Sequence, residues 1–199
     1  MSQQYFTSSP TSAHKYERFS VSLLDQSLTF VTDAGVFSKG EVDYGTRVLL
    51  TALPPLSGRV LDLGCGWGAI GVTIGKKYPD IEIVMGDVNE RALELTRRNL
   101  SENGVKNAKA VCSDAFQNIE GSFDFIITNP PIRTGKQVIY SMFDTAFTRL
   151  VPGGRMYIVI RKQQGAESAL KHLKEIYSRA EMILRDKGYW IIECEKGCE

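Results

Sequence analysis

Apolar and polar positions along this chain follow two different periods, and from residue 58 onward the two alternate. Short apolar runs predict strands at 59–63, 81–85, 108–112, 123–128 and 156–161. The segments between them predict helices at 68–77, 89–102, 138–150 and 167–177. Strands that alternate with helices predict an α/β fold with a Rossmann-like, doubly wound and mostly parallel sheet.

Two segments outside this alternation predict antiparallel hairpins. Near the C-terminus, strands at 181–184 and 189–195 flank the turn signal Asp186-Lys187-Gly188, which adds an antiparallel edge and brings the sheet to seven strands. Near the N-terminus, strands at 18–23 and 28–32 flank Asp25-Gln26-Ser27. A helix at 42–52 follows and ends at Leu53-Pro54-Pro55.

This pattern divides the chain into three parts. Residues 1–15 are polar and predict a flexible arm, residues 16–57 an N-terminal hairpin and helix packed on the core, and residues 58–199 the core itself. The chain has 199 residues, of which 43% are hydrophobic and 24% charged, as in ordinary globular proteins. No apolar run approaches the roughly 20 residues that span a bilayer, and no secretory segment precedes the fold. We therefore expect a cytoplasmic protein with no membrane partner.

Charge and cysteine content narrow the chemistry only a little. A formal net charge of +1 gives no evidence for nucleic acid binding, although a local basic rim is compatible with it. The four cysteines lack the spacing of a disulfide framework, which fits a reducing compartment. With two histidines and no CxxC motif, we expect no metal site.

A glycine-rich turn follows the strand at 59–63. The run Asp62-Leu63-Gly64-Cys65-Gly66-Trp67-Gly68-Ala69 fits the G-x-G-x-x-A nucleotide fingerprint, although glycines after a strand also serve plain tight turns. An ionised Asp62 would repel the pyrophosphate of NAD, whereas it would attract the sulfonium and ammonium groups of S-adenosylmethionine. We therefore expect S-adenosylmethionine, with Asp62, Gly64, Cys65 and Gly66 as its contacts.

Two more acidic residues follow the next two strands. Asp87 comes 23 residues after Gly64, close to the offset of about 20 at which a carboxylate accepts the ribose hydroxyls of an adenosine. Asp114 follows the strand at 108–112 and could accept from the adenine amino group, or it is an ordinary loop residue. The expected cofactor contacts thus also include Asp87, Val88, Asp114 and Ala115, together with Asn129 from the turn described next.

The strand at 123–128 runs into Asn129-Pro130-Pro131-Ile132. Two prolines fix φ and remove two backbone donors, so the chain makes a stiff turn beyond the carboxyl end of a strand, where open α/β sheets bind ligands. The turn presents the Asn129 amide beside backbone carbonyls that we expect to be free to accept, an arrangement suited to holding an amino group. Asn129, Pro130 and Pro131 are the predicted catalytic residues; the alternative is a Pro-Pro turn that only closes the strand.

Together these motifs resemble those of class I S-adenosylmethionine-dependent methyltransferases. More narrowly, Gly35-Val36-Phe37-Ser38-Lys39, Asp43-Tyr44-Gly45-Thr46 and Arg161-Lys162-Gln163-Gln164-Gly165 resemble the small-subunit ribosomal RNA guanine-N2 methyltransferases of the RsmC type. The resemblance covers about residues 15 to 196. It implies an RNA substrate, transfer of a methyl group to an exocyclic amine, and a role for Asn129 and Pro130 in holding that amine.

Residues of the expected substrate rim follow from position and from the resemblance. They are Phe37, Lys39, Ile132, Arg133, Arg161 and Lys162. Many amino-methylating relatives have an aromatic residue where Ile132 stands, so stacking on the target base would come from Phe37 or Tyr44. Adenine-N6 or protein glutamine methylation, an NAD-dependent oxidoreductase and a non-catalytic RNA-binding assembly factor stay open as alternatives. The sequence indicates no oligomeric state.

Overall fold

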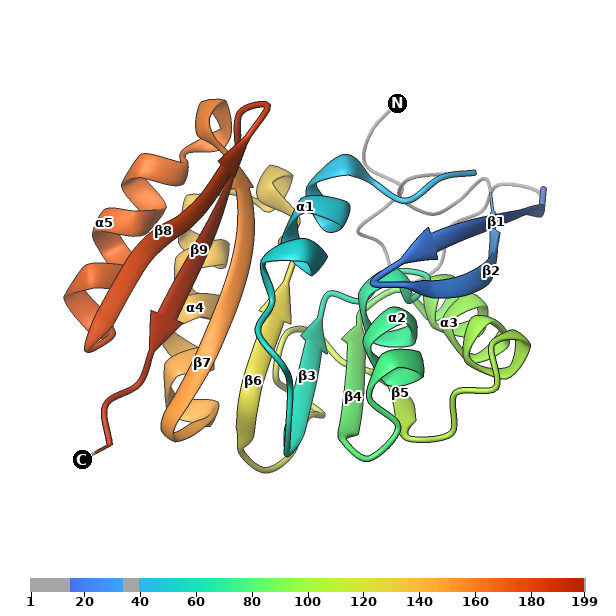
Figure 1. Cartoon of the computed structure of the whole chain (residues 1–199). Coiled ribbons are helices and arrows are strands. Elements are labelled where there is room, and N and C mark those ends of the chain that lie inside the picture. Colours follow the sequence, from blue (N-terminus) through green and yellow to red (C-terminus); the bar gives the residue numbers. More distant parts are fainter. Residues whose placement is uncertain (1–14, 34–39, 199) are drawn as a thin grey trace.

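The computed structural model describes residues 15–33 and 40–198, and a seven-stranded sheet forms its centre (Figure 1). The spatial order of the strands is β5-β4-β3-β6-β7-β9-β8. Strands β3 to β7 pair in parallel, whereas β9 is antiparallel to both β7 and β8. The predicted fold class is therefore confirmed. The strands are β3 (Arg59–Leu63), β4 (Glu82–Asp87), β5 (Ala108–Cys112), β6 (Phe123–Thr128), β7 (Leu150–Arg161), β8 (Arg179–Asp186) and β9 (Tyr189–Glu195).

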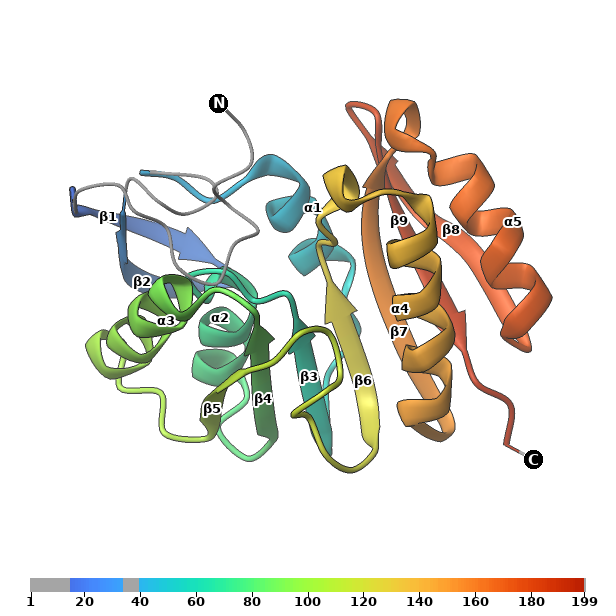
Figure 2. The same cartoon turned by 180° about the vertical axis from the view of Figure 1, so that it is seen from behind.

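Helices cover both faces of the sheet, which is what buries strands that are apolar on both sides. Side chains of α1 (Tyr44–Ala52), α2 (Ala69–Lys77) and α3 (Glu90–Glu102) form one apolar cluster with the sheet. Those of α4 (Lys136–Arg149) and α5 (Ala166–Ile176) form a second cluster on the opposite face (Figure 2). No helix in residues 15–33 and 40–198 has the length and apolar character to cross a membrane.

The N-terminal strands β1 (Glu17–Leu23) and β2 (Gln26–Thr32) form a separate two-stranded sheet on α2 and α3. Two asparagines, Asn99 of α3 and Asn103 at its C-cap, pair with the outer edge of β2 as a neighbouring strand would. Asn103 bonds both the N–H and the carbonyl of Thr29, at 3.0 and 2.8 Å. Asn99 does the same to Val31, at 2.8 and 3.0 Å. A hairpin of two strands is only marginally stable alone, and these amides both hold it and cover its edge.

The N-terminal turn is shorter than predicted. The connecting residues are Leu24 and Asp25, with φ of 49° and 63°, and β2 already begins at Gln26. Two consecutive residues with positive φ are typical of the two-residue type I′ turn, which matches the twist of a hairpin. Leucine is rare at such a position, so the expected turn Asp25-Gln26-Ser27 was one residue too far along the chain.

Strand β7 is longer than predicted at its start. The helix before it ends at Arg149, one residue before its predicted end at 150, and Leu150 already pairs with Phe123 of β6, so the strand start predicted at 156 was wrong. The pairing shifts register past this point. Gly154 allows the shift because a Cβ there would lie 2.9 Å from the Val151 carbonyl oxygen.

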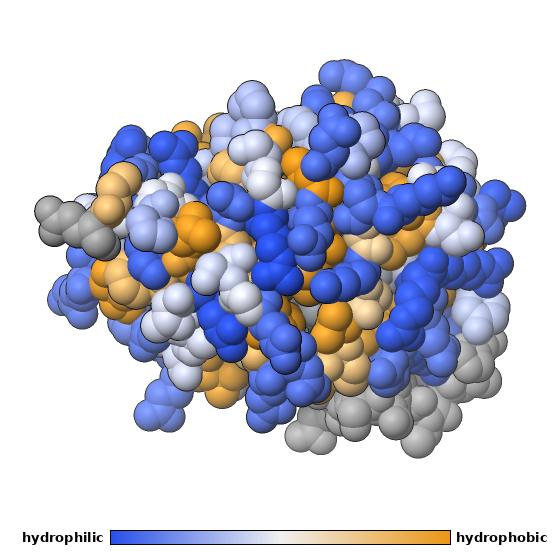
Figure 3. Space-filling model, turned by 90° about the horizontal axis from the view of Figure 1, so that it is seen from below, coloured by the Kyte–Doolittle hydropathy of each residue, from blue (hydrophilic) through white to orange (hydrophobic). Residues whose placement is uncertain are grey.

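Other boundaries move by one to a few residues, and two short 3-10 helices, η2 (Ile132–Thr134) and η3 (Lys162–Gln164), were not predicted. Seen from below, at the amino ends of β3, β4 and β6, the surface is largely hydrophilic with apolar residues scattered between (Figure 3). The predicted motifs all belong to the opposite end of the sheet. Residues 1–14 of the expected arm lie outside the described residues.

Candidate active site

The carboxyl ends of β3, β4 and β6 meet along the upper edge of the sheet in Figure 1, and each leads into a predicted motif. The hydroxyl of Thr128, the last residue of β6, donates to the carbonyl of Leu63 at 2.8 Å. This bond fixes the end of β6 against the start of the glycine turn. The glycine turn and the Asn-Pro-Pro turn are therefore held side by side.

The glycine turn is open on its outer side. Gly64 and Gly66 have φ of 74° and 56°, and a Cβ built on either would meet nothing within 4 Å. The backbone N–H groups of Gly64 and Cys65 both donate to the Gly86 carbonyl, at 2.8 and 2.9 Å, which ties the turn to β4. The Cys65 thiol is buried, 3.9 Å from the Thr96 hydroxyl, and burial raises its pKa. Cys65 thus offers a ligand its backbone rather than its side chain.

Asp62 lies beneath this turn and is fully buried. Its Oδ2 accepts from the N–H of Gly71 at 2.8 Å, while no described residue donates to its Oδ1. Burial raises the pKa of Asp62 from 3.8 to about 7, although the hydrogen bond from Gly71 opposes part of this shift. In the absence of a ligand, Asp62 is therefore less readily ionised than we expected from the sequence. A cation placed beside the unpaired oxygen would favour the charged form.

Asp87 connects the end of β4 to the glycine turn. Its Oδ2 accepts from the Gly66 N–H at 2.8 Å and its Oδ1 from the Asn89 N–H at 2.9 Å, and burial raises its pKa. Each carboxylate oxygen keeps a lone pair, so Asp87 can still accept from ribose hydroxyls. Val88, which follows it, is half-buried.

Asp114 and Ala115 lie in the loop after β5. The loop is held beside Asp87, because the Ser113 N–H donates to the Asp87 carbonyl at 2.9 Å. The Asp114 carboxylate is exposed and makes no hydrogen bond to a residue of the described part of the chain. It is available to a ligand that lies along the strand ends.

The Asn-Pro-Pro turn is an inverse γ-turn, since Pro131 has φ −74° and ψ 77° and the Ile132 N–H donates to the Pro130 carbonyl at 2.9 Å. The expectation that the turn leaves its carbonyls free is therefore only partly right. The Pro131 carbonyl accepts from both the N–H and the hydroxyl of Thr134, at 3.0 and 2.9 Å. The Pro130 carbonyl keeps one lone pair. Ile132 is half-buried against the apolar cluster of α4.

The Asn129 amide is held by the start of α1, a contact that sequence reasoning missed. Its Nδ2 donates to Asp43 Oδ2 and to Thr46 Oγ1, each at 3.1 Å. Asp43 also caps α1, since the same Oδ2 accepts from the Thr46 N–H at 3.1 Å. Asp43 and Thr46 stand in a motif that carries the family resemblance, but spacing along the chain cannot show that they meet Asn129.

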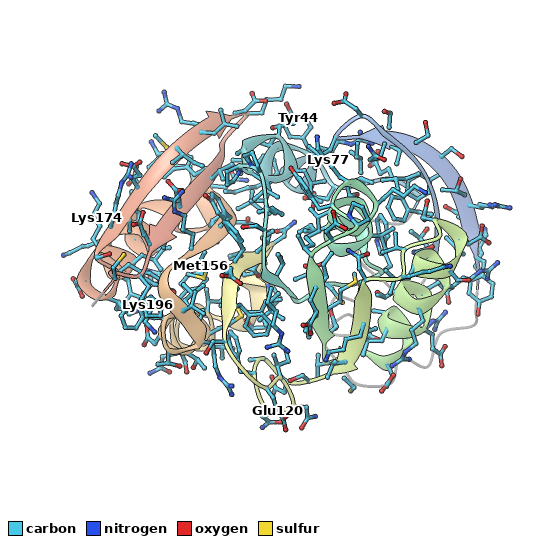
Figure 4. The ribbon with its side chains drawn as sticks, turned by 60° about the horizontal axis from the view of Figure 1, so that its bottom comes forward. Tyr44, Lys77, Glu120, Met156, Lys174 and Lys196 are labelled. Carbon is cyan, nitrogen blue, oxygen red and sulfur yellow. The ribbon has the colours of Figure 1, made fainter. Side chains whose placement is uncertain are left out.

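The rim beside this site is built from the β8–β9 hairpin, the end of β7 and the start of α1, where Figure 4 shows Tyr44. Arg161 donates to the Tyr189 hydroxyl at 2.5 Å, and Tyr44 donates to Asp186 at 2.5 Å. Lys187 lies over the Tyr44 ring, 4.6 Å from its centre. Because of these contacts the Tyr44 side chain is half-buried, so its ring is not a freely exposed surface for stacking on a base.

The other predicted rim residues are dispersed. Lys162 begins η3 and its ammonium lies 3.4 Å from the Glu167 carboxylate. Arg133 belongs to η2. Phe37 and Lys39 lie outside the described residues. Within residues 15–33 and 40–198, no three His, Cys, Asp or Glu side chains form a group that could hold a metal ion.

Comparison with known proteins adds a family to this geometry. The protein-family model of the methyltransferase small domain matches residues 27–193 of this chain. A protein of Bacillus subtilis (strain 168), the uncharacterized protein YbxB, is 40% identical over 200 residues, which is 98% of this chain and 100% of the relative. Ribosomal RNA small subunit methyltransferase C of Vibrio parahaemolyticus is 35% identical over 188 residues, 91% of this chain and 53% of the relative.

A solved structure with the same fold carries ligands. The T. thermophilus 16S rRNA N2 G1207 methyltransferase (RsmC), in complex with AdoMet and guanosine, superposes with a TM-score of 0.82 at 29% identity and covers 94% of this chain. This chain spans 52% of that protein. It thus covers the whole of the Bacillus relative but about half of these two ribosomal RNA methyltransferases.

Proposed function

This chain belongs to the methyltransferase small-domain family, and from that premise we propose that it methylates the N2 amine of a guanine in RNA, with small-subunit ribosomal RNA as the substrate. The coarser activity is established by the family: the protein is an S-adenosylmethionine-dependent methyltransferase, and the expected cofactor is confirmed. The alternative of an NAD-dependent oxidoreductase is left without support.

The residues at the strand ends fit this cofactor. The space outside Gly64 and Gly66 would take the cofactor against backbone, and a Cβ at either position would fill it. The unpaired Asp62 oxygen suits a cationic group, and Asp87 suits the ribose hydroxyls. We assign Asp114 and Ala115 to the adenine side of the site. The cofactor supplies a methyl group activated by a positively charged sulfur.

The observation that carries the proposal is the free amide oxygen of Asn129. Both amide N–H groups are taken by Asp43 and Thr46, so the side chain can only accept from a substrate. Its oxygen and the remaining lone pair of the Pro130 carbonyl would each accept one N–H of a primary amine. The amine lone pair is then aimed away from the turn. Positioning of this kind can supply roughly 7–11 kcal/mol of a barrier without a covalent intermediate.

The choice of guanine in RNA rests on the relatives and on local charge. The T. thermophilus neighbour is named for N2 methylation of a guanine and was solved with guanosine. Arg161 ends β7, and Lys136 and Lys162 follow strand ends on the same side. All three are exposed, so they can contact phosphates although the net charge of the chain is only +1.

Mass mapping of ribosomal RNA tests the substrate. A strain without the gene should lose one methyl group on one guanine, and the purified enzyme with labelled cofactor should restore it. Unchanged mass at every methylated guanine would rule out this substrate. In that case, separate RNA, DNA and protein pools with labelled cofactor would show whether adenine or glutamine takes up the label.

An Asn129→Ala variant tests the clamp. The variant should still bind the cofactor, whereas transfer should fall by about 10²–10³, the effect typical of removing one preorganised contact to a reacting group. A variant that methylates at the wild-type rate would show that Asn129 has no part in the chemistry.

A further inference from the structure

The orientation of the Asn129 amide is decided by helix α1, not by the Asn-Pro-Pro turn itself. An amide can present either its oxygen or its NH₂ group to a ligand, and the two orientations have nearly the same shape. Asp43 removes this ambiguity, because a carboxylate can only accept. If the amide were turned over, its oxygen would face the Asp43 carboxylate across about the 3.1 Å that the N–H now bridges.

The second N–H of the amide is also committed. Thr46 Oγ1 accepts it at 3.1 Å, and Thr46 is buried, with 5% of its surface exposed. No described residue donates to the amide oxygen, and that oxygen is not among the buried unpaired atoms of the described part of the chain. Asn129 is thus fixed as an acceptor that a ligand can reach.

Helix α1 is itself rigidly placed. Asp43 caps it through the Thr46 N–H, and the helix packs on β7 and β9. Gly45 lies so close to the ring of Tyr189 that a Cβ there would be 2.6 Å from the ring carbon Cε1. The two groups that hold Asn129 therefore stand on an element locked against the sheet.

We propose that Asp43 and Thr46 are positioning residues of the methyl transfer, which orient the Asn129 amide and strengthen its oxygen as an acceptor. The proposal rests on the proposed function. A hydrogen bond from the amide N–H to a carboxylate draws electron density toward the amide oxygen. That oxygen faces the amine, which gains positive charge as its nitrogen forms a bond to the methyl group and the carbon–sulfur bond breaks. A proton of the amine then leaves to water.

Paired variants separate this role from helix capping. Asp43→Ser keeps a good N-cap residue but shortens the side chain by one bond, so its oxygen can cap Thr46 without reaching Asn129. Asp43→Asn keeps both an oxygen and the length. Thr46→Val removes the hydroxyl at nearly constant shape, and Thr46→Ser keeps it.

Turnover number, KM for RNA, cofactor affinity and melting temperature are measured for all four variants. Asp43→Ser and Thr46→Val should each lower kcat about tenfold, with cofactor affinity and melting temperature near wild type. Asp43→Asn and Thr46→Ser should recover kcat to within about threefold. Wild-type kcat in both Asp43→Ser and Thr46→Val would overturn the proposal, as would losses that follow melting temperature alone.

Hydrogen exchange of the Asn129 side-chain amide gives a readout that needs no activity. Both protons should exchange slowly in the wild type, compared with the exposed amide of Gln137, and fast in the Asp43→Ser/Thr46→Val double variant. If the wild type methylates no guanine, the proposed substrate fails while this measurement still decides the orientation. Fast exchange of both Asn129 protons in the wild type would overturn the positioning role.

Discussion

Replacing Asp62 by Asn should stabilise the cofactor-free protein and weaken its hold on the cofactor. Asp62 is fully buried and one of its oxygens has no donor among the described residues, so the folded state resists its ionisation. The pKa rises from 3.8 to about 7, which means that the folded chain binds this proton more tightly than the unfolded chain. The stability contributed by Asp62 is therefore full below pH 3.8 and is lost as the pH rises through about 7.

The size of the effect follows from these two values. Each pKa unit corresponds to about 1.36 kcal/mol, so above pH 7 the ionised Asp62 costs on the order of 4 kcal/mol relative to a neutral side chain of the same shape. At pH 5 the unfolded chain is already ionised while the folded chain is not, and the cost is about 2 kcal/mol. The melting temperature of the Asn variant should therefore exceed that of the wild type, and this margin should widen by about 5–10 °C between pH 5 and pH 8.

Thermal unfolding of both proteins across this pH range measures the margin, and taking the difference cancels the other titrating groups. Asp114→Asn, at an exposed carboxylate of a neighbouring strand end, is the matched control and should show no such widening. Calorimetry should show weaker binding of S-adenosylmethionine to Asp62→Asn. A margin that is the same at pH 5 and pH 8 would refute the reasoning about burial, and unchanged cofactor affinity would refute the contact with a cation.

Three further predictions concern packing and the rim. Gly45→Ala should cost about 1–3 kcal/mol despite its better helix propensity, because its Cβ would lie 2.6 Å from the Tyr189 ring; chemical denaturation should show the penalty vanish in a Tyr189→Ala background. Arg91→Met should destabilise the fold by about 3–5 kcal/mol in the same assay, since it leaves the buried Asp33 carboxylate without the guanidinium 2.6 Å away, whereas the exposed Arg98→Met should change little. Lys162→Ala should weaken RNA binding for all sequences alike and reduce the salt dependence of log K by about 1, whereas Lys174→Ala on α5 should leave both unchanged; equal salt slopes would place Lys162 outside the RNA path.

The sheet and its motifs were predictable because their cause is local. Alternating strands and helices determine a parallel sheet, and parallel strands bring their carboxyl ends to one edge. Asp62, Asp87 and Asn129 each follow a strand directly, so their common location at that edge needed no knowledge of side-chain contacts. The β8–β9 hairpin was equally readable from Lys187-Gly188, whose φ values of 43° and 81° are those of a type I′ turn.

What could not be predicted depends on contacts between distant segments. The bonds from Asn129 to Asp43 and Thr46 join residues 86 and 83 positions apart. The burial of Asp62 depends on how α2 packs over β3, and the early start of β7 on the pairing of Leu150 with Phe123. Leu24 adopts a positive φ, which is rare for leucine, because the pairing of β1 with β2 sets the register at this turn.

Asn99, one of the two asparagines that pair with the edge of β2, has a further consequence for cofactor binding. The Nδ2 of Asn99 also donates to the carbonyl of Trp67, within the glycine turn, at 2.8 Å, and the Trp67 ring lies 4.9 Å from that of Phe30 in β2. Docking of the hairpin and the shape of the turn are therefore linked equilibria that share one coupling free energy. By reciprocity, if the docked hairpin strengthens cofactor binding, the bound cofactor stabilises the hairpin against local opening by the same free energy. Backbone hydrogen exchange at Thr29 and Val31 should accordingly slow when S-adenosylmethionine is added, although neither residue is expected to touch it.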